Sequence, residues 1–246
     1  MPAPRLLRLL PAAVLLMAAA TSEAASLQVA PTQVRVPAGR AADGLTLANN
    51  GSSPLQAQVR AYLWTQQDGE DVLVPTRDIA VSPPMVGLAG GATQLVRVVR
   101  LGPPPQDGAE AAYRILVDEL PPADDTGRKP GLNFVLQYSI PVFLAPAGDG
   151  PVEPRLEARI TREGGTATLE LSNHGNGHAR IADLVFERGD GSRLVIAQGL
   201  AGYVLPGSHR RWPVPDDAAP GQAGAFKARV NGETEERTLA VHPPPH

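Results

Sequence analysis

The sequence predicts an all-β protein made of two β-sandwiches, and three observations support this fold class. Apolar and polar residues alternate with a period of two in many short segments, which is typical of strands with one buried face. Glycine and proline, 25 and 26 of the 246 residues, separate these segments, and no segment keeps a helical period. The length suits two domains of roughly 100–120 residues behind a short leader.

The first residues have the layout of a secretory signal peptide. Two arginines precede the apolar run Leu9–Ala20, and the small residues Ser22 and Ala24 follow at the distance that cleavage requires. A membrane anchor is the alternative, but the apolar run is shorter than the ~20 residues that span a bilayer. We therefore expect residues 1–24 to be removed, by a cut after Ala24 or Ala25, and the mature protein to be secreted and soluble.

The first half of the chain, residues 25–146, contains a clearly patterned strand at Leu55–Leu63. Its odd positions are apolar and mostly glutamine or arginine stands between them, so one face is expected to be buried. The turn residues Asn49–Gly51 precede this strand. Further strands of this half are expected at Val72–Val74, Leu95–Leu101, Tyr113–Leu120 and Leu132–Phe143, with turns at Asp68–Gly69 and Gly90–Gly91.

The segment Ala145–Pro151 is predicted to link two domains, because small residues, proline and glycine dominate it. The second half, residues 152–246, repeats the strand pattern with hairpin turns at Gly164–Gly165 and Arg188–Gly191. Its strands are expected at Arg155–Arg162, Thr166–Ser172, Arg180–Glu187, Arg193–Gln198, His209–Val214 and Ala225–Val230.

Composition excludes several classes of protein. The chain has no cysteine, which removes disulfides, thiol catalysis and cysteine–metal sites. The formal net charge is −3 and both signs are mixed along the chain, so no basic surface is predicted that would attract nucleic acid or an anionic membrane.

Residues that could carry chemistry are few. His174 and His178 are four positions apart, a spacing that places two metal ligands together on a helix, but the glycines around them favour a polar loop and no third ligand is near. Asp118 and Glu119 lie at a strand end, where a structural ion pair is favoured over acid–base catalysis. The chain has no nucleophile elbow, phosphate loop or HExxH motif, so we predict neither an enzyme nor a metal site.

The strand predicted at Leu132–Phe143 is open to two interpretations. Its large apolar side chains fall on one face: Leu132, Phe134, Leu136 and Tyr138. An ordinary core strand would show this pattern. An edge strand that awaits a partner would also show it, and a protein that keeps such an edge exposed would use it for strand addition.

Four stretches of the first half, taken in order, resemble the periplasmic chaperones of chaperone–usher pili. They are Val29–Gly39, Val81–Pro84 with Gly90–Gly91 and Leu95–Val98, Tyr113–Pro121, and Leu136–Phe143. The opening of the third stretch and the end of the fourth are similar to the divergent branch often called archaic. The second half matches the family only in size and style.

The resemblance implies two immunoglobulin-like β-sandwich domains in a boomerang arrangement. It also implies the function of a periplasmic chaperone, in which the last strand of the first domain fills the groove of a pilin subunit that lacks its own last strand. Leu132, Phe134, Leu136 and Tyr138 would then be the groove-filling side chains. An outer-membrane usher would receive the complex, and no cofactor is implied.

The resemblance also implies a site for the C-terminal carboxylate of the subunit. Family members commonly hold it with an arginine on the first strand and a lysine on the last, but Gln33 and Pro141 stand at those positions here. A partly desolvated carboxylate still needs a cation. If the last two strands of the domain form a hairpin, Arg114 lies near Pro141 and the cleft between the domains, and we predict that it is the anchor. Arg35 and Arg100 are the alternatives.

Two further features follow from the resemblance. Arg97 and Glu119 match positions where the family has an ion pair that faces the cleft and fixes the interdomain angle. The third member of that network falls near Gly232, which carries no charge. Ser82–Pro83 matches a peptide bond that is often cis in relatives.

A different binding module is the main alternative, such as a secreted β-sandwich that binds carbohydrate or a cell surface. Such a module would need clustered exposed aromatic residues, but Trp64 and Trp212 are far apart in sequence and aromatic residues are only 4% of the chain. A secreted hydrolase is disfavoured by the absence of catalytic motifs. The sequence leaves open whether the free protein covers its exposed strand by forming a homodimer.

Overall fold

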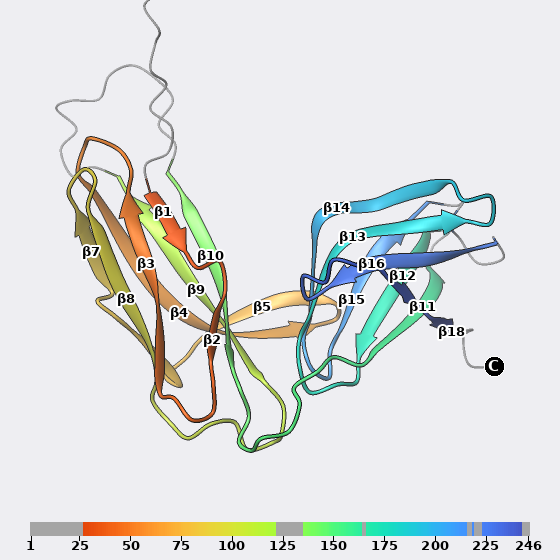
Figure 1. The fold of residues 1–246 in the computed structure, drawn as a ribbon, viewed down its shortest axis with the longest axis horizontal. Coiled ribbons are helices and arrows are strands. Elements are labelled where there is room, and N and C mark those ends of the chain that lie inside the picture. The colour runs from red at the N-terminus through yellow and green to blue at the C-terminus, as the bar shows by residue number, and fades with distance from the viewer. Residues whose placement is uncertain (1–26, 122–134, 164–165, 216–217, 219–222, 243–246) are drawn as a thin grey trace, which may run out of the picture.

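The computed structural model describes residues 27–121, 135–163, 166–215, 218 and 223–242. Two β-sandwiches meet at an angle (Figure 1); the first sandwich lies between residues 27 and 144 and the second between residues 156 and 242. This confirms the all-β fold of two sandwiches in a boomerang arrangement. The expected signal peptide lies outside the described residues, which include no helix of the length and apolar character needed to cross a membrane.

The first sandwich consists of two sheets. One has the strand order β1-β3-β8-β6, formed by β1 (Leu27–Ala30), β3 (Ala42–Asn49), β8 (Thr93–Arg100) and β6 (Ile79–Ser82). The other has the order β2-β10-β9-β4-β5, formed by β2 (Val34–Val36), β10 (Gln137–Leu144), β9 (Ala111–Leu120), β4 (Leu55–Gln67) and β5 (Glu70–Pro75), with β7 (Met85–Leu88) also paired to β4. Apolar side chains of both sheets form one core.

The first strand segment of the chain changes from one sheet to the other. β1 pairs with β3 in the antiparallel direction, whereas β2 pairs with β10 in the parallel direction. The turn between them contains Pro31, whose peptide bond with Ala30 is cis, and the Ser82–Pro83 bond is also cis, as the resemblance implied. One short segment therefore closes an edge of both sheets.

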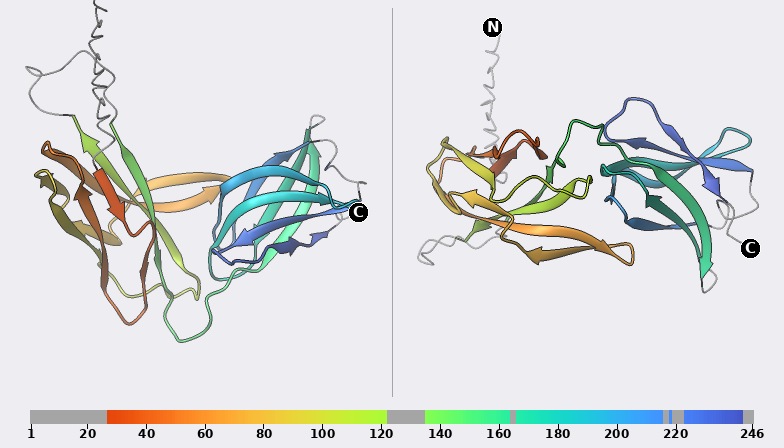
Figure 2. Two further views of the ribbon diagram at one scale, coloured as in Figure 1. Left: turned by 45° about the horizontal axis from the view of Figure 1, so that its top comes forward. Right: turned by 90° about the horizontal axis from the view of Figure 1, so that it is seen from below.

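β4 is longer than the sequence pattern predicted. Leu55, Ala57 and Val59 are buried in the core, as expected from their alternation. The strand continues to Gln67, and Asp68 and Gly69, which both have positive φ, turn the chain into β5. The hairpin of β4 and β5 extends from the first sandwich to the second (Figure 2).

The second sandwich also consists of two sheets. Their strands are β15 (His209–Val214), β12 (Thr166–Asn173), β11 (Leu156–Glu163) and β18 (Val241–His242) in one, and β14 (Arg193–Val204), β13 (Ala179–Arg188), β16 (Gly224–Val230) and β17 (Arg237–Leu239) in the other. β14 continues six residues beyond the predicted end at Gln198, because register shifts against β13 accommodate Gly199 and Gly202 within the strand. This extension carries Tyr203 to the first sandwich.

A small buried cluster joins the two sandwiches. Its members are Trp64, Ala112, Phe143, Tyr203 and Leu205. The side chain of Gln66 adds two hydrogen bonds: Nε2 donates to the carbonyl oxygen of Tyr203 at 2.8 Å, and Oε1 accepts from the backbone N–H of Leu205 at 3.0 Å. Apolar packing and directional hydrogen bonds therefore both fix the angle between the sandwiches.

Candidate functional site

The sheet of β2, β10, β9, β4 and β5 turns one face to the core and the other toward the second sandwich. On β9, Tyr113 and Ile115 are buried in the core, so Arg114 between them projects from the opposite face. Trp64 and Phe143 lie on that face too and contact the second sandwich. We call it the joint face and take it as the candidate site.

β10 is a central strand at one end and an edge strand at the other. It pairs with β9 along its whole length, but β2 covers only Val142–Leu144. Within the described part of the chain, Gln137–Pro141 therefore has no strand on its second side. The sequence left a core strand and an edge strand open as alternatives, and β10 combines the two.

Only half of the expected groove-filling residues can be located. Leu132 and Phe134 lie outside the described residues. Leu136 and Tyr138 are partly buried against the core of the first sandwich, and the Tyr138 hydroxyl donates to the carbonyl oxygen of Leu27 at 2.6 Å. Tyr138 therefore has a structural role within the first sandwich.

Arg114 lies where the hairpin argument placed it, opposite Pro141 of β10. Its guanidinium carbon is 3.7 Å from the centre of the Trp64 ring and 5.2 Å from that of Tyr203. Nη1 donates only a long hydrogen bond, 3.4 Å, to the carbonyl oxygen of Ser139. Burial lowers the pKa of Arg114, and the described residues include no carboxylate paired with it.

Arg114 has lost hydration without gaining a charged partner among the described residues. A cation placed against aromatic rings and removed from water is stabilised by about 2 kcal/mol through its contact with the rings, which does not replace the lost hydration. A carboxylate bound to the open edge of the guanidinium would supply charge-assisted hydrogen bonds. Arg114 is therefore suited to bind an anion that arrives from outside the protein.

The two alternative anchors lie in different places. Arg35 is exposed on the joint face, opposite Phe143 across the β2–β10 pair. Arg100 lies at the end of the first sandwich, where Nη2 donates to the carbonyl oxygen of Ala38 at 3.2 Å. It lines a hollow of about 370 Å³ together with Asp78 and Tyr113, so it faces away from Arg114.

The structure does not bring Arg97 and Glu119 together, so the prediction that they form an ion pair is wrong. Arg97 alternates with the buried Val96 and Val98 on β8, so it points out from the other sheet of the first sandwich. Glu119 is on β9, in the sheet of the joint face. Two strands that are consecutive in sequence belong here to opposite sheets, which separates the two side chains.

The ion pair that does form at this end of β9 uses the neighbouring residue, Asp118. Its Oδ2 lies 2.7 Å from Nη2 of Arg60, and Gln137 of β10 donates to its other oxygen. Burial raises the pKa of Asp118, but the hydrogen bonds from Gln137 and Arg60 outweigh this effect, and the net pKa is lowered. These bonds tie the open end of β10 to β9 and β4.

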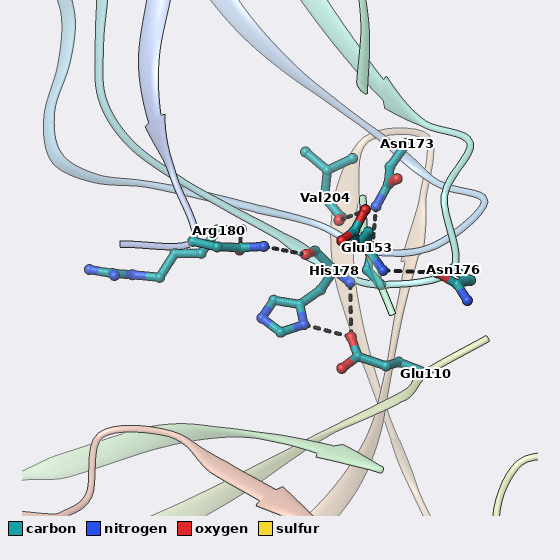
Figure 3. Close-up of polar contacts among 9 residues, drawn as sticks. Glu110, Glu153, Asn173, Asn176, His178, Arg180 and Val204 are labelled. Atoms are coloured by element: carbon teal, nitrogen blue, oxygen red, sulfur yellow. Dashed lines mark hydrogen bonds and ion pairs between the residues drawn. The ribbon is translucent and has the colours of Figure 1, made fainter. Parts of the chain in front are cut away.

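His178 forms a contact between the sandwiches that the sequence pattern did not reveal (Figure 3). Its ring stacks on Phe143 with centroids 3.5 Å apart, Nδ1 lies 2.7 Å from Oε2 of Glu110, and its backbone N–H donates to the same oxygen at 2.9 Å. His174 is exposed near Glu157, so the two histidines do not converge on a metal. Across the described ranges no group of three potential metal ligands occurs.

Both tryptophans are buried, in separate clusters. Trp64 belongs to the contact between the sandwiches and Trp212 to the core of the second sandwich. They do not form the exposed aromatic platform that a carbohydrate-binding module would need.

These features define a class of protein: two immunoglobulin-like sandwiches whose joint carries, beside a partly open strand edge, a half-buried arginine that no carboxylate of the described residues pairs with. Residues 26–149 match the family model described as pili and flagellar-assembly chaperone, PapD N-terminal domain. The chain therefore belongs to this family of pilus-assembly chaperones. No curated protein matches the chain.

Solved structures share the fold over most of the chain. A structure of the CsuC–CsuE chaperone–tip adhesion subunit pre-assembly complex, from archaic chaperone-usher Csu pili of Acinetobacter baumannii, matches with a TM-score of 0.72 and 22% identity, over 90% of this chain and 100% of that chain. The CupB2 chaperone of Pseudomonas aeruginosa matches with a TM-score of 0.64 and 17% identity, over 87% and 100%. At these identities the comparison shows the fold.

Proposed function

We propose that this protein is a periplasmic chaperone that captures pilus subunits by strand addition and delivers them to an outer-membrane usher. Its site would consist of the segment that leads into β10, with Leu132, Phe134 and Leu136 as groove-filling side chains, and of Arg114 as the anchor for the subunit's C-terminal carboxylate. The archaic chaperones are the branch it resembles. The leader-like N-terminus supports export to the periplasm.

The open edge of β10 supports strand addition. A subunit strand laid beside Gln137–Pro141 would satisfy backbone groups on both chains, which cost free energy when they are buried unpaired. Each Leu or Phe side chain that enters the subunit groove would contribute about 1.5–3 kcal/mol. Folding and burial of the subunit drive capture, so no nucleotide is needed. Release would follow when the strand of another subunit replaces that of the chaperone.

The observation that carries this proposal is the position of Arg114. It stands beside the open edge of β10, half-buried and without a carboxylate partner among the described residues. A subunit whose last strand pairs there would bring its terminal carboxylate to the guanidinium. Strand pairing and anchoring would then fix the register of the bound subunit together.

Co-expression with a candidate pilin in a periplasm tests the proposal. A tag on this protein is used for purification, and the wild type is compared with Phe134→Asp and Arg114→Gln. We expect a one-to-one complex that Phe134→Asp abolishes, because a carboxylate cannot enter an apolar groove. Arg114→Gln should weaken it about tenfold or more, the value of a charge-assisted hydrogen bond.

The matched control is Arg97→Gln, which removes an exposed arginine from the opposite sheet. It should leave the complex intact. Strand donation is refuted if the pilin is equally soluble without this protein, or if Phe134→Asp leaves the complex unchanged.

A further inference from the structure

Arg114 is one cation, whereas a carboxylate has two oxygens that can each accept from a separate guanidinium. Gln33 and Pro141 occupy the two usual positions, so the second charge must come from elsewhere if the site keeps it. The second sandwich brings another arginine to the joint: Arg210 of β15.

The position of Arg210 depends on a glycine of the opposite sheet. Gly202 of β14 has φ +146, and a Cβ atom there would lie 2.8 Å from Nε and 3.2 Å from Cζ of Arg210. The guanidinium therefore occupies the space that a side chain at position 202 would take. Because 23% of the Arg210 side chain is exposed, it is held in place yet remains accessible at the joint.

Arg210 reaches across to the hairpin of the first sandwich. Its Nη1 lies 3.3 Å from Oδ1 of Asp71 on β5, and the same oxygen accepts from Nε2 of Gln66 at 2.9 Å. Gln66 also binds the backbone of Tyr203, so these groups form one connected network across the joint.

Arg114 and Arg210 both reach the end of β14, since the guanidinium carbon of Arg114 lies 5.2 Å from the centre of the Tyr203 ring and Arg210 fills the space beside Gly202. Together with Asp71 they form one group of charges. Burial is the largest cause of the lowered pKa of Arg114, while the charges of Asp71 and Arg210 act on that pKa in opposite directions. Asp71 is the ion-pair partner of Arg210 and supplies the one negative charge of this group, and its side chain is 36% exposed. The group has a net positive charge and five donors on each arginine, and it can accept one more carboxylate.

We propose that Arg210 is the second cation of the carboxylate site, so that the C-terminus of a bound subunit is held between Arg114 of the first sandwich and Arg210 of the second. This inference rests on the proposed function. It makes the second sandwich part of the binding site, and it couples carboxylate binding to the docking of the two sandwiches, since each stabilises the other.

Two other arginines of the joint are less suitable. Arg35 lies opposite Phe143, with β10 between it and Arg114. Arg180 lies opposite Tyr203 on β13, and its Nη1 is directed to Gly232. Both provide matched arginine-to-glutamine variants.

The test uses the full-length protein and one probe in two forms: a synthetic peptide of the last strand of the candidate pilin, as the free acid and as the C-terminal amide. Affinities are measured by calorimetry for the wild type, Arg210→Gln, Arg210→Lys, Arg180→Gln and Arg35→Gln. We expect Arg210→Gln to lower the affinity for the acid peptide about tenfold to a hundredfold, and the affinity for the amide by less than about twofold. Arg210→Lys should restore part of the loss, and the control variant Arg180→Gln should change neither affinity more than about threefold. Arg35→Gln tests the other candidate for the second cation.

The outcomes separate the two proposals. Equal weakening of acid and amide by Arg210→Gln would mean that Arg210 only supports the joint, and this inference is then wrong. If Arg210→Gln still binds the acid peptide more tightly than the amide, and Arg35→Gln does not, the second cation is Arg35. If the wild type itself binds acid and amide equally, there is no carboxylate site, and the anchor role of Arg114 fails as well.

Discussion

The two halves of β10 differ in what surrounds them. At Val142–Leu144 the strand has neighbours on both sides, and Phe143 is 1% exposed within the contact between the sandwiches. Among the described ranges, Gln137–Pro141 pairs with β9 alone, and Ser139 on the joint face is exposed. One continuous strand therefore builds the joint with one half and leaves the other half available, which lets a rigid scaffold present a strand edge without unfolding.

Phe143→Ala should cause the largest loss of unfolding free energy, because it removes a ring that packs on Trp64, His178 and Tyr203. Truncation of a buried Phe costs about 3–5 kcal/mol. Urea denaturation followed by tryptophan fluorescence measures the loss of unfolding free energy. The control is Ser139→Ala, on the same face of the open half, which should change it by less than about 0.5 kcal/mol. Equal effects of the two variants would contradict the division of β10.

Tyr138→Phe should lower the unfolding free energy by less, about 1 kcal/mol, because it removes only the hydrogen bond to Leu27 and keeps the ring. The same denaturation measurement applies. The yield of the pilin complex should not change, since this hydroxyl is already bonded within the first sandwich. A variant with unchanged stability but a lower yield of complex would instead assign the hydroxyl to the subunit.

The sequence predicted those features that depend on local pattern. The alternation in Leu55–Leu63 gave β4 its buried face, and the pairing of consecutive strands gave Arg114 its place opposite Pro141. The first follows from the period of a strand, and the second from the tendency of consecutive strands to pair.

The joint could not be predicted in this way. His178 and Glu110 are 68 positions apart, and Gln66 and Leu205 are 139 apart, so no local period relates them. The only indication was the unusual polar, glycine-rich segment that ends in His178. The predicted ion pair of Arg97 and Glu119 was wrong for a different reason. The resemblance implied that the two side chains meet, but they belong to separate sheets.

Asp118→Asn should cause the smallest loss of unfolding free energy, and this loss should depend on pH. The net pKa of Asp118 is lowered in the folded protein, so its ionised form stabilises the fold above the unfolded pKa of about 3.9. This contribution is lost as the pH falls through the lower, folded value. Since Arg60 is 43% exposed, the pair contributes at most about 1 kcal/mol at pH 7.

Urea midpoints of wild type and Asp118→Asn at pH 7 and at pH 2 measure this dependence. The two proteins should differ at pH 7, and the difference should narrow toward pH 2 as the wild-type carboxyl takes up a proton. A double-mutant cycle with Arg60→Gln at pH 7 separates the ion pair from the hydrogen bond of Gln137. A difference that persists unchanged at pH 2 would mean that Asp118 supports the open half of β10 through its shape and not through its charge.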